Sequence, residues 1–274
     1  MDHTEEQLDA FADWERRSWE TRAAPYARNL TDLTGGAAEA LLEAAEVGAG
    51  TCVLDVATGP GVVALAARRR GADVTAVDQA AAMVQLARAA GLDARQARAE
   101  DLPFEDGAFD AVVAGFLLNH MARPQSGVAE LARVCRGRVA LSVWDGPDAN
   151  PALGLFGPIV ESFGMLDAVP AGPDSAMFSD DARLAALLAA VGLDDIRVTR
   201  VRWAVTVEPG RWFDAVADGT PRTGAVLAAA TAEQRLRLRH RYVEVATASY
   251  GTSGDQVTLP AAAVVGSGRK QPAP

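Results

Sequence analysis

Residues 53–65 read VLDVATGPGVVAL, an apolar run that ends in an acidic residue and turns through glycines into an alanine-rich helix. The run from Thr51 to Val56 has the length and composition of a strand buried on both faces of a parallel sheet. Gly59 and Gly61 let the backbone pass close to a ligand, because no Cβ stands in the way. The start of the following helix adds unpaired N–H groups. This stretch therefore predicts a strand–turn–helix unit that binds a ligand at its turn.

Strand-like and helix-like segments alternate along the rest of the chain, which is typical of βαβ units. We expect an α/β fold with a doubly wound, mostly parallel seven-stranded sheet, N-terminal helices and a helical insertion as a lid. Besides the first strand, the expected strands cover residues 73–77, 94–97, 109–114, 138–144, 196–207 and 257–265.

The chain is divided into segments by changes in this pattern. Pro25 is expected to end the first helix, since proline lacks the N–H that a helix needs. The end of the chain after Gly266 is expected to be frayed. The predicted division is a helical lid over 1–36, an α/β cofactor-binding core over 37–145, an insertion over 146–178, a continuation of the core over 179–208, a helical cap over 209–252, and a last strand and tail over 253–274.

Composition argues against several classes of partner. The formal charge is −10 and the basic residues are scattered, so no nucleic-acid partner is expected. No apolar stretch is long enough to cross a membrane, and the acidic N-terminus does not resemble a secretory signal, so we expect a cytoplasmic protein with no membrane partner. The two cysteines and three histidines are too dispersed to predict a metal site. A homodimer is left open.

The glycine turn favours a ligand with an amine over one with a phosphate. The turn departs from the G-x-G-x-x-G pattern of dinucleotide-binding enzymes, and Asp55 stands directly before it. Asp78 ends the next strand, where a carboxylate can accept hydrogen bonds from ribose hydroxyls. That feature serves NAD and S-adenosylmethionine alike. A tight turn with no ligand remains the alternative.

A third motif, AEDLPFEDGAFDAVVAGFLLNHM at residues 99–121, completes a recognisable order. Together with LDVATGPG and VDQAAAMV, it resembles the class I S-adenosylmethionine-dependent methyltransferases. The similarity is greatest to the small-molecule group that includes the ubiquinone and menaquinone C-methyltransferases and many bacterial natural-product enzymes. It covers roughly residues 26–145, and the ordered combination is specific, whereas each piece alone is not.

The resemblance implies S-adenosylmethionine as cofactor and assigns roles to particular residues. It implies that Asp55 orients the ammonium, that Asp78 binds the ribose, and that Glu100 faces the adenine. Ala57 replaces the usual first glycine, so we expect its backbone to avoid positive φ. Arg98 stands where an acid often contacts the adenine amine. The full implied cofactor set is Tyr26, Asp55, Ala57, Gly59, Gly61, Asp78, Gln79, Met83, Ala99, Glu100 and Ala114.

The expected activity is methyl transfer from S-adenosylmethionine to a small-molecule acceptor. The alanine-, arginine- and glycine-rich composition suggests a GC-rich bacterial source and hence a role in specialised metabolism. Two alternatives stay open: an enzyme of the same fold that uses the cofactor for cyclisation or cleavage, and a non-catalytic binding protein. The sequence identifies neither the acceptor nor the atom that is methylated.

His120 is the best candidate for a general base, because it follows the fourth strand near the rim where such sheets bind ligands. The alternative is a histidine that packs locally and hydrogen-bonds to its neighbours. His240 is a weaker candidate on a solvated helix. Asp145 ends the fifth strand at the same rim, where it could touch the acceptor or cap the loop. The aromatic residues considered for the acceptor wall or a lid are Trp14, Trp19, Trp144, Phe156, Phe163, Trp203, Trp212 and Phe213.

Overall fold

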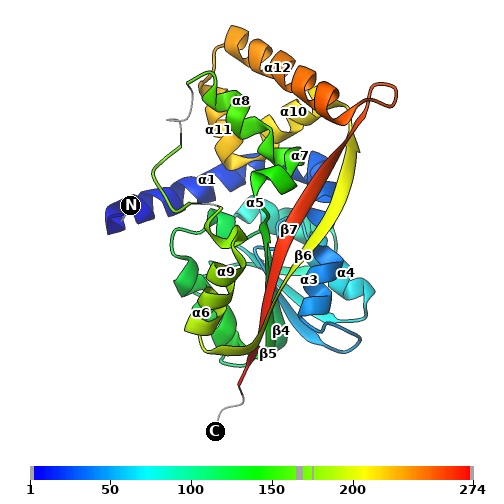
Figure 1. The fold of residues 1–274 in the computed structure, drawn as a ribbon. Helices are drawn as coiled ribbons and strands as arrows, with labels where there is room; N and C mark the ends of the chain where they lie inside the picture. Colours follow the sequence, from blue (N-terminus) through cyan, green and yellow to red (C-terminus); the bar gives the residue numbers. More distant parts are fainter. Residues whose placement is uncertain (1–2, 165–168, 175, 272–274) are drawn as a thin grey trace.

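The chain folds into an α/β core that carries a helical cap at one end (Figure 1). The computed structural model describes residues 3–164, 169–174 and 176–271. The parts of the predicted lid, insertion and tail that fall on residues 1–2, 165–168, 175 and 272–274 lie outside the described residues. Within the described part, no helix is both long and apolar enough to cross a membrane.

The core is built on one seven-stranded sheet with the order β3-β2-β1-β4-β5-β7-β6. The first five strands pair in parallel, and β7 runs antiparallel to both of its neighbours. The expected doubly wound, mostly parallel sheet is therefore confirmed. The strands are β1 Cys52–Val56, β2 Asp73–Asp78, β3 Asp93–Gln96, β4 Phe109–Gly115, β5 Cys135–Trp144, β6 Leu193–Val207 and β7 Val257–Lys270.

Helices cover both faces of the sheet and form the cap. The α-helices are α1 Glu5–Asn29, α2 Thr31–Gly35, α3 Ala38–Ala44, α4 Val62–Arg69, α5 Ala81–Ala89, α6 Pro124–Val134, α7 Pro151–Gly154, α8 Phe156–Glu161, α9 Asp181–Ala190, α10 Pro209–Gly219, α11 Pro221–Ala229 and α12 Ala232–Tyr250. Short 3₁₀ helices in the described part of the chain are η1 Leu118–His120, η2 Pro147–Ala149 and η4 Met177–Ser179.

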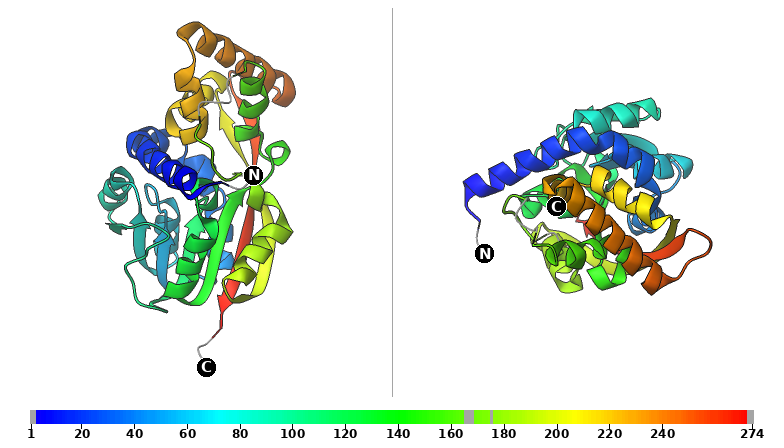
Figure 2. Two further views of the ribbon diagram at one scale, coloured as in Figure 1. Left: turned by 90° about the vertical axis from the view of Figure 1, so that its left-hand side faces the viewer. Right: turned by 90° about the horizontal axis from the view of Figure 1, so that it is seen from above.

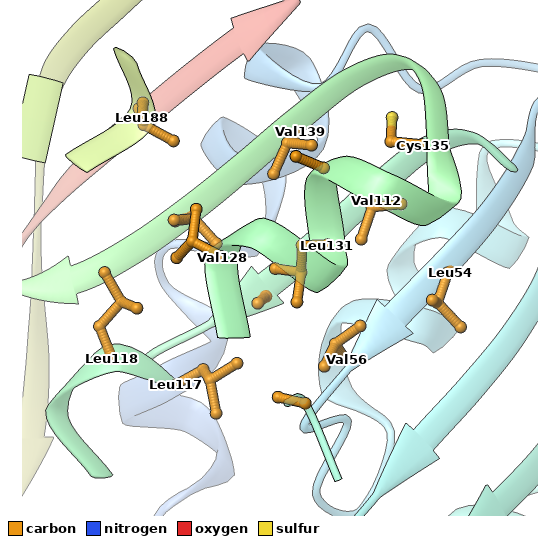
Figure 3. Packing of buried hydrophobic residues seen from close by; sticks show 14 of the residues in the cluster. Leu54, Val56, Val112, Leu117, Leu118, Val128, Leu131, Cys135, Val139 and Leu188 are labelled. Carbon is orange, nitrogen blue, oxygen red and sulfur yellow. The ribbon is translucent and has the colours of Figure 1, made fainter. Parts of the chain in front are cut away.

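The two faces of the sheet bury alternate residues of each strand, as the period of two requires. Figure 3 shows Leu54, Val112 and Val139 from three strands packed with Leu131 of α6, and Leu188 of α9 belongs to the same buried cluster. The opposite face packs against α3 and α4 in a second cluster. Burying each such aliphatic side chain stabilises the fold by roughly 1.5–3 kcal/mol.

The cap has a hydrophobic core of its own. The paired strands β6 and β7 extend beyond the parallel strands (Figure 1). Helices α10, α11 and α12 follow β6 and precede β7 in the chain. Phe156 of α8, Phe213 of α10 and Tyr242 of α12 pack together there, with ring centroids 4.6–5.8 Å apart. Helix α1 crosses the molecule between core and cap, and it packs on α5 of the core and α10 of the cap (Figure 2).

Two expectations about local structure were wrong. Pro25 does not end the first helix, because α1 continues to Asn29 with the proline inside it, held by packing on both sides. The end of the chain is not frayed after Gly266, because β7 continues to Lys270 and pairs there with β5 and β6. Helix α9 is capped by Asp180, whose side chain accepts from Arg183 N.

Gly61 is the turn residue whose replacement should cost the most. Its φ is +97°, and a Cβ there would stand 2.4 Å from Leu92 Cδ1. We expect Gly61→Ala to lower the free energy of unfolding by about 2–3 kcal/mol, from left-handed backbone strain and overpacking. Denaturant unfolding measures this. Gly48→Ala, where a Cβ would meet nothing within 4 Å, is the control and should change stability by less than about 0.5 kcal/mol. Equal effects of the two substitutions would contradict the packing described.

Candidate functional site

A cavity of about 430 Å³ opens at the carboxyl ends of the parallel strands, between the core, α1 and the cap. It lies where the strand order reverses between β1 and β4, which is where open α/β sheets bind ligands. Its volume falls within the roughly 300–1,000 Å³ usual for cofactor and small-molecule pockets. Nine residues of the implied cofactor set line it: Tyr26, Asp55, Ala57, Gly59, Asp78, Gln79, Met83, Ala99 and Glu100.

Two members of that set do not line the cavity. Gly61 is the N-cap of α4 and has a left-handed backbone conformation, so it shapes the turn without lining the cavity. Ala114 is fully buried within β4, and the cavity wall begins at the next residue, Gly115. The roles implied for both residues as direct contacts stay predictions.

Asp55 is the buried carboxylate at the end of the central strand. Its Oδ2 accepts from Thr58 Oγ1 at 2.7 Å and from Ala64 N, at the start of α4, at 3.0 Å. Its Oδ1 is buried and has no hydrogen-bond partner in the described structure. Burial raises the pKa of Asp55 to about 7, opposed by those two hydrogen bonds. A cation at Oδ1 would satisfy this oxygen and favour the ionised form.

This arrangement disfavours a phosphate at the same turn. In dinucleotide-binding enzymes the N-terminus of the first helix holds the pyrophosphate. Here the Asp55 carboxylate already takes an N–H of that turn of α4. A second anion would therefore be repelled, whereas an ammonium would be attracted.

The turn itself contains a strained residue. Ala57 has φ +58°, so the expectation that its backbone avoids positive φ was wrong. A left-handed alanine costs about 1–2 kcal/mol, and the tie from Thr58 N to Val77 O at 3.0 Å helps to hold it. Phe116, at the end of β4, is strained in the same way with φ +57°. Both residues line the cavity, where such strain is commonly found in proteins.

Asp78 lies beside Asp55 at the end of β2. Its Oδ2 accepts from Gly59 N at 2.9 Å and its Oδ1 from Ala80 N at 2.9 Å, which joins the turn to the start of α5. Burial raises the pKa of Asp78 to about 6. Each carboxylate oxygen can accept more than one hydrogen bond, so a ribose hydroxyl can share these oxygens.

The far end of the cavity suits a flat, polar-edged group. Met83 of α5 and Ala99 offer an apolar surface, and Gln79 follows Asp78. The Glu100 carboxylate lies 3.7 Å from the Arg98 guanidinium. Arg98, which stands where an acid often contacts the adenine amine, thus pairs with Glu100, the acid predicted to face the adenine.

Helix α1 closes this end of the cavity. The Tyr26 hydroxyl donates to Thr34 Oγ1 at 3.0 Å, and burial raises the pKa of Tyr26 to about 12, so the phenol stays neutral. The Tyr26 ring lies over Gly59, whose φ of +55° favours glycine and whose lack of a Cβ leaves the space beneath the ring free. Glu20 of α1 accepts from Ala81 N and Ala82 N at 2.6 and 3.0 Å, which caps α5 from outside.

His120 lies on η1 and lines the cavity, as predicted for a base. Its Nδ1 is 3.0 Å from Oε2 of Glu15, whose side chain is fully buried. The Trp19 ring meets the imidazole edge-on, with ring centroids 5.0 Å apart. Arg222 of α11 lies on the other side of Glu15, with Nε 3.6 Å from Oε1.

Sequence reasoning missed Glu15 and Arg222. A signal for Glu15 is present in α1, because Phe11, Glu15, Trp19 and Ala23 recur at every fourth position and a charge in such an apolar stripe is unusual. Arg222 is one of several arginines in the cap and carries no comparable signal.

The aromatic candidates divide between the cavity and the two cores. Trp19 and Trp144 line the cavity, and Trp144 stacks on Phe116 with ring centroids 3.9 Å apart. Trp14 packs on Phe11, and Trp203 packs beside Trp144. The residues that belong to the cap cluster are Phe156, Phe163, Trp212 and Phe213.

The two remaining polar candidates also find their places. Asp145 lines the cavity, but its Oδ1 accepts from Gly146 N at 2.8 Å and its Oδ2 lies 3.2 Å from Arg200 Nε, so it caps the loop and holds an ion pair. His240 is exposed on α12.

The residues present fit an adenosyl amino acid. The buried Oδ1 of Asp55 lacks a partner, Gly59 leaves space beneath Tyr26, and Asp78 stands beside both. The ammonium of such a ligand would pair with Asp55, its sulfur-containing chain would pass over Gly59, and its ribose would bind Asp78.

Comparison with known proteins points the same way. A family model described as a methyltransferase domain matches residues 54–142, from β1 into β5. An uncharacterised protein of Mycobacterium tuberculosis is 36% identical over 146 residues, which are 50% of this chain and 53% of that protein, so the match spans about half of that relative's length. A demethylmenaquinone methyltransferase of Mycolicibacterium vanbaalenii is 30% identical over 171 residues, covering 57% of this chain and 73% of that enzyme.

A solved structure shares the fold. A putative methyltransferase from an antibiotic biosynthesis pathway of Anabaena variabilis has a TM-score of 0.57 at 16% identity, over 83% of this chain and 95% of that structure. At this identity the likeness establishes the arrangement of helices and strands.

We expect the stability of the ligand-free protein to fall as pH rises from 5 to 8. The folded pKa values of Asp55 and Asp78, about 7 and about 6, lie above the unfolded value near 3.9. The folded chain therefore holds protons in this range that the unfolded chain has released, so raising the pH favours unfolding. Asp55→Asn keeps an acceptor oxygen but cannot ionise, and should reduce this fall by roughly 2 kcal/mol. Denaturant unfolding at several pH values measures it, and parallel curves for the two proteins would contradict the assignment.

Proposed function

Because this chain belongs to the class I S-adenosylmethionine-dependent methyltransferases, we propose that it transfers a methyl group from S-adenosylmethionine to a small-molecule acceptor held between core and cap. The main support for the proposal is the buried Oδ1 of Asp55, which has no hydrogen-bond partner in the described structure. It lies beside Asp78 at the carboxyl ends of the parallel strands. Two desolvated carboxylates there call for a ligand that brings a positive charge and several donors.

The chain's own residues would bind and orient the reactants. Asp55 would hold the amino group, Asp78 the ribose, and Met83 with Ala99 the adenine face. When bound, S-adenosylmethionine supplies a methyl group activated by the positive charge on its sulfur. Holding an acceptor in line with that group is a positioning task, and positioning can lower a barrier by about 7–11 kcal/mol.

The acceptor would occupy the part of the cavity between α1, the end of β5 and the cap. Trp144 and Leu153 offer apolar surface there, and Thr223 comes from α11. We propose His120 as the group that takes a proton from the acceptor, since it lines the same cavity. The composition supports a bacterial specialised-metabolism acceptor rather than a nucleic acid.

Calorimetric titration with S-adenosylmethionine tests cofactor binding, and product mass tests the reaction. We expect Asp78→Ala to weaken binding about 10–100-fold, because hydrogen bonds to a charged group contribute about 1.5–3 kcal/mol. Asp73→Ala, at the exposed start of the same strand, is the control and should bind like the wild type. An acceptor that gains one methylene in mass supports methyl transfer.

Two results would contradict the proposal. Wild-type affinity in a folded Asp78→Ala variant would remove the ribose assignment. An unmethylated, rearranged product would indicate one of the non-methyl reactions open to this fold.

A further inference from the structure

Glu15 is a fully buried carboxylate in a position where an apolar side chain would pack at lower cost. It lies on the buried stripe of α1, between Phe11 and Ala23. An ionised carboxylate buried in protein is costly unless it is paired, and replacing a buried ion pair by apolar residues is often neutral or stabilising. The contacts of Glu15 therefore point to a use beyond fold stability.

The partners of Glu15 come from two distant parts of the chain. Its Oε2 lies 3.0 Å from Nδ1 of His120 on η1, and its Oε1 lies 3.6 Å from Nε of Arg222 on α11. Arg222 also donates from Nη2 to the Asn119 carbonyl at 3.2 Å, and its guanidinium lies over the Phe11 ring. The core, the first helix and the cap thus meet at one carboxylate.

This contact sets the state of the imidazole. An ionised carboxylate can only accept, so Nδ1 of His120 donates to it. In the neutral imidazole, Nε2 then carries the lone pair. The side chain of His120 is 22% exposed and lines the cavity, and Trp19 fixes its ring edge-on. A carboxylate that holds a histidine in its base-competent tautomer is the arrangement of hydrolase triads.

We propose that Glu15 is a positioning residue that makes His120 the base for a hydroxyl-bearing aromatic acceptor, a phenol. The inference rests on the proposed function and adds its acceptor class. A phenol loses its proton on methylation, whereas an amine needs only to be neutral before it reacts. The stacked pair of Phe116 and Trp144 offers a flat wall for such a ring in the same cavity.

The step balances without a further reactant. The acceptor O–H bond breaks and its proton passes to Nε2 of His120. The acceptor oxygen forms the new O–CH₃ bond, and the electron pair of the breaking S–CH₃ bond stays on sulfur, which becomes a neutral thioether. The imidazolium then returns its proton to water.

Glu15→Gln is the central variant. Arg222 only donates hydrogen bonds, so the glutamine oxygen should face Arg222 and its NH₂ group should face Nδ1. His120 would then carry its proton on Nε2, the wrong nitrogen for a base. The chain has three histidines, so ¹⁵N NMR of the imidazoles, with His120→Gln for assignment, can read this tautomer without cofactor or acceptor.

Activity is measured with 1-naphthol, catechol and 7-hydroxycoumarin, against 1-naphthylamine and aniline. We expect the wild type to methylate phenols in preference to amines. His120→Gln and Glu15→Gln should each lose roughly 10²-fold or more in kcat, while S-adenosylmethionine affinity stays within about twofold. Asp13→Asn is the matched control. Asp13 is a partly exposed residue of α1 that pairs with Arg16 and Arg17, and the variant should match the wild type.

These outcomes distinguish failure of the proposed function from failure of the role of Glu15 or of the acceptor class. A wild type that binds no S-adenosylmethionine ends the proposed function, and the tautomer of His120 is still measured. Unchanged tautomer and kcat in a folded Glu15→Gln variant would overturn the role of Glu15. Transfer to amines alone, or to none of the phenols, would overturn the acceptor class. If Glu15→Gln does not fold, Glu15→Asp keeps the charge one methylene short and should show an intermediate kcat with the wild-type tautomer; wild-type kcat would count against the proposal.

Discussion

A desolvated carboxylate at the end of the central strand is the constraint on which the site depends. One oxygen of Asp55 fastens the turn to the start of α4, and the other is buried without a hydrogen-bond partner among the described residues. Asp78, buried beside it, fastens the same turn to α5. Because burial disfavours both charges, the ligand-free site is electrostatically incomplete. A cation completes it, which explains how a fold shared with dinucleotide-binding enzymes can select a sulfonium amino acid instead.

The first helix forms one wall of this strand-end site. Glu20 caps α5, Tyr26 covers Gly59, and Glu15 meets His120, so one helix supports three parts of the site. Its other face packs on α10 of the cap (Figure 2). Glu15, the proposed partner of the base, therefore lies on the helix that packs against both core and cap.

Short-range patterns in the sequence predict the strands of the sheet well, and the resemblance implies residues that gather at one end of it. The strand ends at Asp55 and Asp78 follow from apolar runs that stop at an acid, and nine of the implied cofactor residues meet in one cavity. Long-range packing lies beyond those patterns. Pro25 stays helical because α5 and α10 hold α1 from both sides, and Ala57 accepts a left-handed backbone because its neighbours anchor the turn. The contact of Arg222 with Glu15 joins segments that no local signal relates.

A crystal structure with S-adenosylhomocysteine bound would test the central claim most directly, since it locates each group of the ligand. The account predicts its amino group within hydrogen-bond reach of Asp55 Oδ1, its ribose hydroxyls at Asp78, and its chain passing over Gly59 beneath Tyr26. A ligand held elsewhere on the surface, or one whose amino group leaves Asp55 Oδ1 without a partner, would contradict it.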